Sequence, residues 1–355
     1  MSRSDLMPVF DGHNDVLLRL IRGKAHPERD FLEGDNLGHL DLPRMRQGGF
    51  VGGFFAVYVS SQGTGPDIDD MMAKPQYDIP LPSELELAPS QQVTIHMAAL
   101  LLRIERASKG EVKVCRTAAD IRNCIKTGTL ATILHIEGAE GIDPDFHLLD
   151  VLYGSGLRSI GPVWSRSNIF GHGVPFRYPS GPDTGPGLTD LGRELIRACN
   201  QRKIMIDLSH LNEKGFWDVA RISDAPLVAT HSNAHVISPH SRNLLDKQLA
   251  AIRESKGMVG VNFATSFIRS DGRRNEHTPL EEMIRHMDHL IEHVGVDGVG
   301  LGSDFDGATI PAEIGDVAGL PRLVDAMRRH GYDEATLRKL CYENWVNVLE
   351  RTWGQ

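Results

Sequence analysis

Short apolar, β-branched segments recur along the chain, and longer segments with a helical spacing of apolar residues separate most of them. Eight apolar segments lie at 7–10, 53–59, 130–136, 157–163, 204–208, 227–229, 258–263 and 298–301. Helical patterns lie between them at 88–108, 188–201, 213–222, 247–255 and 280–294. Strands that alternate with helices are typical of a parallel sheet built from βα units. We therefore predict an α/β fold, a (β/α)8 TIM barrel.

Three more helical patterns, at 320–330, 334–342 and 345–352, follow the last predicted strand. They predict additional C-terminal helices that cap or flank the barrel. Two segments break the alternation, because 60–89 is rich in Pro, Asp and Met and 165–186 is dense in Gly, Pro and Ser. Long irregular segments after barrel strands often form the walls or lid of an active site, and the alternative is a pair of plain surface loops. We expect one domain, 1–355, with active-site loops at 60–89 and 165–186.

Composition narrows the functional classes. Of 355 residues, 41% are hydrophobic and 24% are charged, and Lys and Arg number 38 against 47 Asp and Glu, for a formal net charge of -9. No basic run suggests a nucleic-acid surface, and no segment approaches the roughly 18 apolar residues of a membrane span. We expect no nucleic-acid or membrane partner and a cytoplasmic location. The cysteines, at 115, 124, 199 and 341, lack a zinc-site spacing, and we expect buried, reduced thiols.

Acidic and histidine side chains follow five of the predicted strands. The active sites of parallel barrels are built at these carboxyl ends, so the side chains should converge. Buried charges need partners or a metal. The residues concerned are His13, Asp15, Glu137, His210, His231 and Asp304.

Three histidines and three carboxylates exceed what one tetrahedral zinc needs, whereas a two-metal site with a bridging carboxylate would use nearly all of them. We therefore favour a binuclear centre. Taken singly, each residue has an alternative: Glu137 could pair with Arg158, Asp304 could cap a turn, and the histidines could be hydrogen-bonded core residues. His135 shares the face of Glu137 by strand alternation, and we leave it out of the ligand set.

Several motifs resemble those of the renal or membrane dipeptidase family, a branch of the amidohydrolase superfamily with binuclear zinc on a TIM barrel. The resemblance spans nearly the whole chain. The motifs are Asp11-Gly12-His13-Asn14-Asp15, Ile136-Glu137-Gly138, Asp207-Leu208-Ser209-His210, His231-Ser232, Pro239-His240-Ser241-Arg242-Asn243 and Gly302-Ser303-Asp304-Phe305-Asp306-Gly307.

The resemblance implies two Zn²⁺ ions with a bridging hydroxide that attacks the peptide bond. It implies that His13 and Asp15 hold one ion, that His210 and His231 hold the other, and that Glu137 bridges them. By the same resemblance, Asp304 would accept the proton of the hydroxide and pass it to the leaving amine, and Arg242 would bind the C-terminal carboxylate of the substrate.

The chain departs from the family at one position. Animal members carry a histidine after the strand equivalent to 157–163, where it contacts the scissile carbonyl, but ungapped alignment places Trp164 there. Either His172 reaches back from the following loop, or the oxyanion is stabilised mainly by zinc.

The leading hypothesis is a zinc dipeptidase that cleaves free dipeptides, L-Xaa-L-Xaa and also L-Xaa-D-Xaa. One alternative is another binuclear-metal amide hydrolase, such as an N-acyl amino acid deacylase, and another is a non-catalytic metal-binding scaffold. Other divalent metals suit the same ligands. The expected partner is a small dipeptide substrate, with a homodimer as an open option.

Overall fold

The computed structural model describes residues 6–22, 25–61 and 68–354. Parallel strands form one sheet with the order β8-β6-β5-β2-β1-β11-β10-β9, and a bridge between Asp207 and Val228 links its two ends into a nearly closed barrel. The strands are β1 (Val9–Asn14), β2 (Phe50–Tyr58), β5 (Leu130–Glu137), β6 (Leu157–Gly161), β8 (Met205–Ile206), β9 (Val228–Ala229), β10 (Met258–Asn262) and β11 (Val299–Gly302). All eight predicted strands and the (β/α)8 barrel are confirmed. A short extra strand, β4 (Val112–Val114), pairs with β5 at the side.

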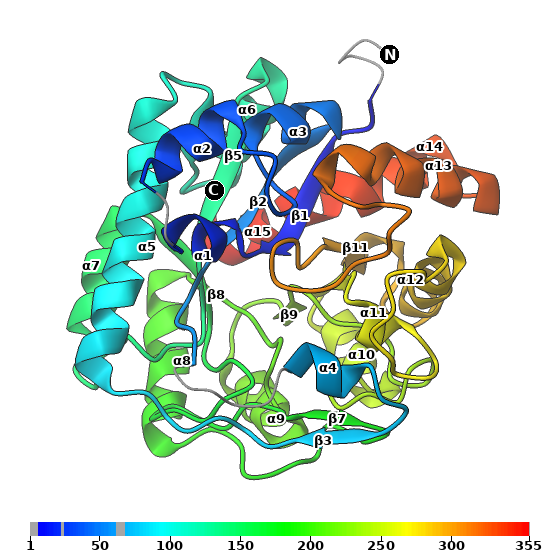
Figure 1. Ribbon diagram of the computed structural model, residues 1–355. Helices are drawn as coiled ribbons and strands as arrows, with labels where there is room; N and C mark the ends of the chain where they lie inside the picture. Colours follow the sequence, from blue (N-terminus) through cyan, green and yellow to red (C-terminus); the bar gives the residue numbers. More distant parts are fainter. Residues whose placement is uncertain (1–5, 23–24, 62–67, 355) are drawn as a thin grey trace.

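Helices surround the sheet (Figure 1). They are α1 (Val16–Ile21), α2 (Pro27–Glu33), α3 (Leu42–Gln47), α4 (Ile68–Met72), α5 (Leu87–Ala107), α6 (Ala118–Thr127), α7 (His147–Ser155), α8 (Asp190–Arg202), α9 (Glu213–Ile222), α10 (Asp246–Glu254), α11 (Thr265–Ile268), α12 (Leu280–Val294), α13 (Leu320–His330), α14 (Glu334–Arg338) and α15 (Asn344–Trp353). Short 3₁₀ turns lie at Val296–Gly298 and Val317–Gly319, and a π-helical turn at Lys339–Glu343.

The helices predicted from periodicity are present, and the one predicted at 334–342 is divided between α14 and the π-helical turn. Several short helices were not predicted, α6 among them. Its N-terminus carries a capping box in which Thr117 Oγ1 accepts from the Asp120 backbone N–H and the Asp120 carboxylate accepts from the Thr117 N–H. That Thr-x-x-Asp spacing was a readable sequence signal.

The C-terminal helix α15 places one large side chain against the barrel strands. Trp345 of α15 is fully buried, and its indole N–H donates to the Leu301 carbonyl at 2.9 Å. A Cβ at Gly12 would lie 2.5 Å from the Trp345 ring, and one at Gly300 would lie 2.8 Å from its Nε1. Strand glycines therefore make room for the indole, and α15 packs against the barrel strands through this side chain.

The two irregular segments contain regular structure and contact each other. Strand β3 (Tyr77–Ile79) from the first pairs antiparallel with β7 (Phe176–Tyr178) from the second, with Ile79 opposite Phe176. The two strands lie beside each other at the bottom of Figure 1. Alternation is too short to detect in three-residue strands, so no sequence pattern predicted this pairing. Residues 62–67 of the first segment lie outside the described residues.

All four cysteines are free and buried, as expected from their spacing. Among the described residues, none of the helices has the length and apolar character needed to cross a membrane.

Candidate metal centre and active site

Six side chains from five strands converge at the carboxyl end of the barrel. His13 lies on β1 and Glu137 ends β5, while the others follow β1, β8, β9 and β11 within a few residues. His13 and His231 are fully buried, and Glu137 is 5% exposed. The residues brought together are His13, Asp15, Glu137, His210, His231 and Asp304.

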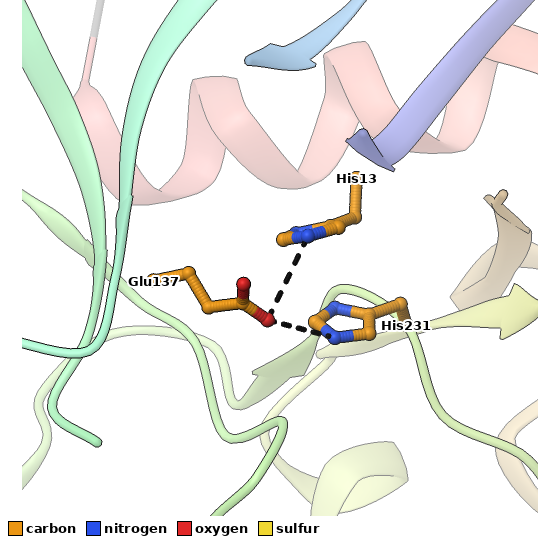
Figure 2. Close-up of side chains that lie close together, drawn as sticks. All are labelled: His13, Glu137 and His231. Atoms are coloured by element: carbon orange, nitrogen blue, oxygen red, sulfur yellow. Dashed lines mark ion pairs between the residues drawn. The ribbon is translucent and has the colours of Figure 1, made fainter. Parts of the chain in front are cut away.

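Glu137 stands at the centre of the histidines. Its Oε1 lies 3.0 Å from His210 Nε2 and 3.3 Å from His231 Nε2, and 3.6 Å from His13 Nε2. Figure 2 shows the Glu137 carboxylate facing the imidazoles of both His13 and His231. Arg158 is not its partner, because that guanidinium donates to backbone carbonyls of residues 116, 153 and 157.

Two further carboxylates, those of Asp15 and Asp304, lie close to His13. Asp15 Oδ2 is 3.3 Å from His13 Nε2, and candidate ligand atoms of His13, Asp15 and Asp304 all lie within 4.8 Å of one another. Gly307 makes this approach possible, because a Cβ there would lie 2.1 Å from Asp15 Oδ2 and 2.4 Å from Asp304 Oδ1. Asp304 itself adopts a positive φ of 58°, a backbone conformation that is uncommon for a residue with a side chain.

Hydrogen bonds behind the histidines fix their orientation. His210 Nδ1 lies 2.8 Å from Ser165 Oγ, and His231 Nδ1 lies 2.8 Å from Thr230 Oγ1. Thr230 Oγ1 in turn donates to Asp207 at 2.6 Å. Contacts of this kind hold metal-binding imidazoles in place and direct the opposite nitrogen inward.

Two buried aspartates organise the strand ends and were not among the predicted site residues. Asp207 accepts from the backbone N–H groups of Ser209 and Thr230, and Asp11 accepts from the backbone N–H and hydroxyl of Ser303. Both lie in the quoted motifs. Their position two or three residues before a site residue was the available signal.

The buried carboxylates of the cluster favour a bound cation. Burial raises the pKa of Glu137 well above its usual range and lowers that of His210 and His231 well below theirs. Burial also disfavours a charged His13, but the charges of Glu137 and Asp15 outweigh it and raise the His13 pKa to about 10. The carboxylates of the cluster thus stabilise a positive charge on His13 at neutral pH. A divalent cation bound in the cluster would balance the same negative charges.

The donor set fits divalent metal ions. The buried Nδ1 and Nε2 of His13 and Oδ1 of Asp15 lack hydrogen-bond partners. His210 Nε2 and His231 Nε2 are 3.1 Å apart, close to the separation of about 3.3 Å between two ligand atoms that are each about 2.0 Å from one tetrahedral zinc. The side chains are imidazoles and carboxylates, which zinc and several other divalent ions accept.

Arg242 is buried, and its position differs from that of a solvated loop arginine. Its Nη2 donates to the His231 carbonyl at 3.1 Å, its Nη1 lies 3.4 Å from Ser232 Oγ, and its Nε has no hydrogen-bond partner. The guanidinium lies 5.5 Å from the centre of the Phe267 ring. Burial lowers the pKa of Arg242 to about 10, against the charges of Asp304 and Glu137.

A cavity of about 270 Å³ opens beside the cluster. Asp15, Glu137, His210 and Asp304 line it together with an aromatic wall that includes Tyr58, Trp164, Phe176 and Phe267. The Trp164 ring lies 5.7 Å from the ring of His210. Residues of the two irregular segments, Met72 and Phe176 among them, thus form part of the wall.

Two other histidines considered in the sequence analysis, His172 and His135, lie in different surroundings. His172 Nδ1 is 2.9 Å from Ser167 Oγ within its own loop, and His172 does not line this cavity. His135 packs edge-on against His13, with 5.5 Å between ring centres, and its Nε2 is 3.6 Å from Asp207 Oδ2. His135 therefore lies behind the cluster and supports it.

Comparison with known proteins assigns the whole chain to one family. The sequence model of the membrane dipeptidase family, peptidase family M19, matches residues 4–353 of this chain. A metallopeptidase from Rhodobacter sphaeroides, whose crystal structure holds a phosphinate mimic of the dipeptide L-Ala-D-Ala, is 60% identical, with a TM-score of 0.97 over 98% of this chain and 100% of its own. The structure of dipeptidase AC, an M19 metallopeptidase, is 59% identical, with a TM-score of 0.96 over 99% of this chain and 100% of its own.

A relative of unknown activity is similar over most of the chain. An uncharacterised Klebsiella pneumoniae protein from the pqqA 5′ region is 52% identical over 72% of this chain and 95% of its own length. The family match over nearly all residues and the two dipeptidase structures agree with each other. This chain belongs to the membrane dipeptidase family, peptidase family M19, and is a metallo-dipeptidase.

Proposed function

We propose that this enzyme hydrolyses free dipeptides with two Zn²⁺ ions held by the buried cluster. His13 and Asp15 would hold one ion, His210 and His231 would hold the other, and Glu137 would be a ligand shared by both. The observation that carries this proposal is the position of Glu137 Oε1, which lies between 3.0 and 3.6 Å from Nε2 of all three histidines. When bound, two divalent ions lower the pKa of water and polarise the scissile carbonyl.

Asp304 is the proton carrier in this proposal. The Asp304 carboxylate lines the cavity, and one of its oxygens lies within 4.8 Å of candidate ligand atoms of His13 and Asp15. It accepts a proton from the attacking water and delivers it to the nitrogen of the leaving amino acid, because an amide nitrogen must be protonated to leave. Burial raises the Asp304 pKa, which favours a group that can both take and release this proton.

Arg242 binds the C-terminal carboxylate of the dipeptide. Its support is a buried guanidinium with an unpaired Nε next to the cluster, since planar guanidinium groups bind carboxylates through paired hydrogen bonds. Trp164 and the aromatic wall exclude water from the reacting bond. Because His172 bonds to Ser167 and does not line the cavity, we propose that a bound metal, and not a histidine, would supply the positive charge beside the scissile carbonyl oxygen.

The substrate class includes dipeptides with a C-terminal D-residue. The support is the Rhodobacter sphaeroides relative, 60% identical, whose structure contains a mimic of L-Ala-D-Ala. The competing function, an N-acyl amino acid deacylase, uses the same metals on a substrate without a free amino group. The cytoplasmic location and the homodimer stay predictions from the sequence.

One experiment separates these functions. The zinc-loaded enzyme is incubated with free L,L and L,D dipeptides and with the same dipeptides N-acetylated, and the released amino acids are measured. We expect cleavage of the free dipeptides alone, with loss of activity on chelation and recovery with zinc. Equal or faster cleavage of the acetylated compounds would favour the deacylase.

A further inference from the structure

Two histidines and an aspartate that belong to none of the strand-end motifs lie together on the outside of the barrel. His289 and His293 are one turn apart on α12, and Asp246 is the first residue of α10. The two helices lie against each other outside the sheet (Figure 1). His289 Nε2 is 2.8 Å and His293 Nε2 is 3.8 Å from the two carboxylate oxygens of Asp246.

The helix presents both imidazoles on one face. Residues four apart on an α-helix are neighbours, and the two rings stack with 4.0 Å between their centres and 25° between their planes. Candidate ligand atoms of all three residues lie within 4.8 Å of one another. The apolar side of α12, with Met283, Met287 and Leu290, packs into the core, so this face remains accessible without loosening the helix.

The hydrogen bond of His293 selects the form of the ring that can bind a metal. His293 Nδ1 is 2.9 Å from the His289 carbonyl oxygen, and a carbonyl can only accept, so Nδ1 carries the proton. In the neutral ring, Nε2 then presents its lone pair toward Asp246. A cation bound there would contact both this lone pair and the Asp246 carboxylate oxygen, which lies 3.8 Å from Nε2.

We propose that Asp246, His289 and His293 form an accessory transition-metal site that takes Zn²⁺. Two imidazoles and one carboxylate are a common zinc donor set, with a water as the fourth ligand. The present separations of 2.8 and 3.8 Å lie on either side of the roughly 3.3 Å between ligand atoms of a tetrahedral zinc with bonds of about 2.0 Å, so only small side-chain rotations are needed. The side chains are 16, 30 and 49% exposed for His289, His293 and Asp246, which leaves room for ion and water.

Other surface clusters lack one of these features. Asp143, Asp145 and His147 are close together, but both Asp143 oxygens already accept from backbone N–H groups at the start of α7. His330 pairs with Asp288 at 2.9 Å, without a second histidine one turn away. The His330 pair is therefore a matched control for a histidine–carboxylate contact that should not hold zinc.

Zinc at this site would join α10 to α12, which pack over β10 and β11 of the barrel. A ligand that binds only the folded state stabilises it. Because His289 Nε2 and a metal compete for the same contact with Asp246, zinc would replace this hydrogen bond, and it would bind only the neutral form of each imidazole.

The test counts zinc on the whole enzyme. Wild type, the double variant His289→Gln/His293→Gln and the control His330→Gln are dialysed against the same micromolar buffered Zn²⁺, and metal per chain is measured by mass spectrometry. We expect the double variant to hold one Zn²⁺ fewer per chain than wild type, with unchanged dipeptidase activity, and the control to match wild type. We also expect added zinc to raise the Tm of wild type more than that of the double variant.

Equal zinc content in wild type and the double variant would overturn the proposal. A separate variant, Asp246→Asn, covers the case in which the double variant does not fold. It removes the charged ligand at the first residue of α10 and leaves the sequence of α12 unchanged. Loss of the additional ion in Asp246→Asn supports the site, and retention of it overturns the site. Neither result depends on the dipeptide chosen, so this test is independent of the proposed catalytic function.

Discussion

The side-chain amide of Asn262 donates a hydrogen bond to Asp304 Oδ2 at 3.0 Å. Asn262 ends β10 and is itself fixed, because its Oδ1 accepts from the backbone N–H of Ala264 at 2.6 Å. The bond holds the Asp304 carboxylate at the cavity wall and favours its ionised form. A residue of one strand thus orients the proposed proton carrier of the next.

Removing this amide should change the pH dependence of catalysis. Burial raises the Asp304 pKa and the Asn262 hydrogen bond lowers it, so Asn262→Ala removes one lowering influence and raises this pKa further. Because the ionised carboxylate is the proton acceptor, activity falls as pH drops through this pKa. We expect the acid limb of kcat/KM to move to higher pH in Asn262→Ala. An unmoved acid limb would separate Asp304 from the rate-determining proton transfer.

Asp304→Asn should abolish proton transfer while leaving the metal ligands in place. We expect kcat to fall by roughly 10²- to 10⁴-fold, the usual contribution of a general acid–base group, with zinc content unchanged. Asp306→Asn is the matched control, because Asp306 lines the same cavity but accepts from the His39 backbone N–H and from Arg19. We expect the control to lower the Tm and to leave kcat nearly unchanged. Full activity in Asp304→Asn would contradict its assigned role.

Arg242→Ala should chiefly weaken substrate binding. Loss of a charged hydrogen-bond partner costs about 1.5 to 3 kcal/mol, which corresponds to a KM increase of roughly 10- to 150-fold at about 1.4 kcal/mol per factor of ten. Steady-state kinetics with a dipeptide and with its C-terminal amide measure the effect. We expect wild type, but not the variant, to prefer the free carboxylate. The same preference in both proteins would remove Arg242 from carboxylate recognition.

Gly307→Ala should disrupt the metal centre through a single methyl group. The new Cβ would lie 2.1 Å from Asp15 Oδ2 and 2.4 Å from Asp304 Oδ1, so both carboxylates must move. We expect loss of bound zinc and of activity. Gly154→Ala is the control, because nothing lies within 4 Å of a Cβ in that α7 position and alanine favours a helix. Retention of zinc by Gly307→Ala would show that the Asp15 ligand can relocate.

His286 should make the enzyme less stable in mild acid. Its Nδ1 accepts from the Ala234 N–H and its Nε2 donates to the Ile268 carbonyl, which holds the ring neutral, and burial lowers its pKa from 6.5 to about 4. Between these values the unfolded chain binds more protons than the folded one. The free energy of unfolding therefore falls as pH drops from about 6.5 to about 4, by at most about 3 kcal/mol from this residue.

Denaturant unfolding of wild type and His286→Gln at several pH values isolates this contribution. Other groups titrate in both proteins, so the informative quantity is the difference between the two slopes of unfolding free energy against pH. We expect a shallower slope for the variant in this range. Parallel slopes would mean that His286 does not stay neutral in the folded enzyme.

The alternation of apolar segments and helices was sufficient to predict the barrel, because each parallel strand needs a crossover that returns the chain to the same end. The same reasoning predicted that residues after β1, β5, β8, β9 and β11 would meet. Asp11, Asp207 and Asn262 were not given roles, because their function depends on partners from other strands, such as Ser303, Thr230 and Asp304. The spacing of residues along the chain does not indicate which residues of other strands these three side chains contact.

The order of strands, the types of side chain at their carboxyl ends and the membership of a metallo-dipeptidase family were all contained in the linear chain. Periodicity and short motifs are local properties, which explains their visibility. Three features required the folded structure: the pairing of β3 with β7, the insertion of Trp345 beside Gly12 and Gly300, and the contact of α10 with α12 that joins Asp246 to His289. Each depends on packing between segments distant in sequence, where shape and burial, and not local pattern, select the neighbours.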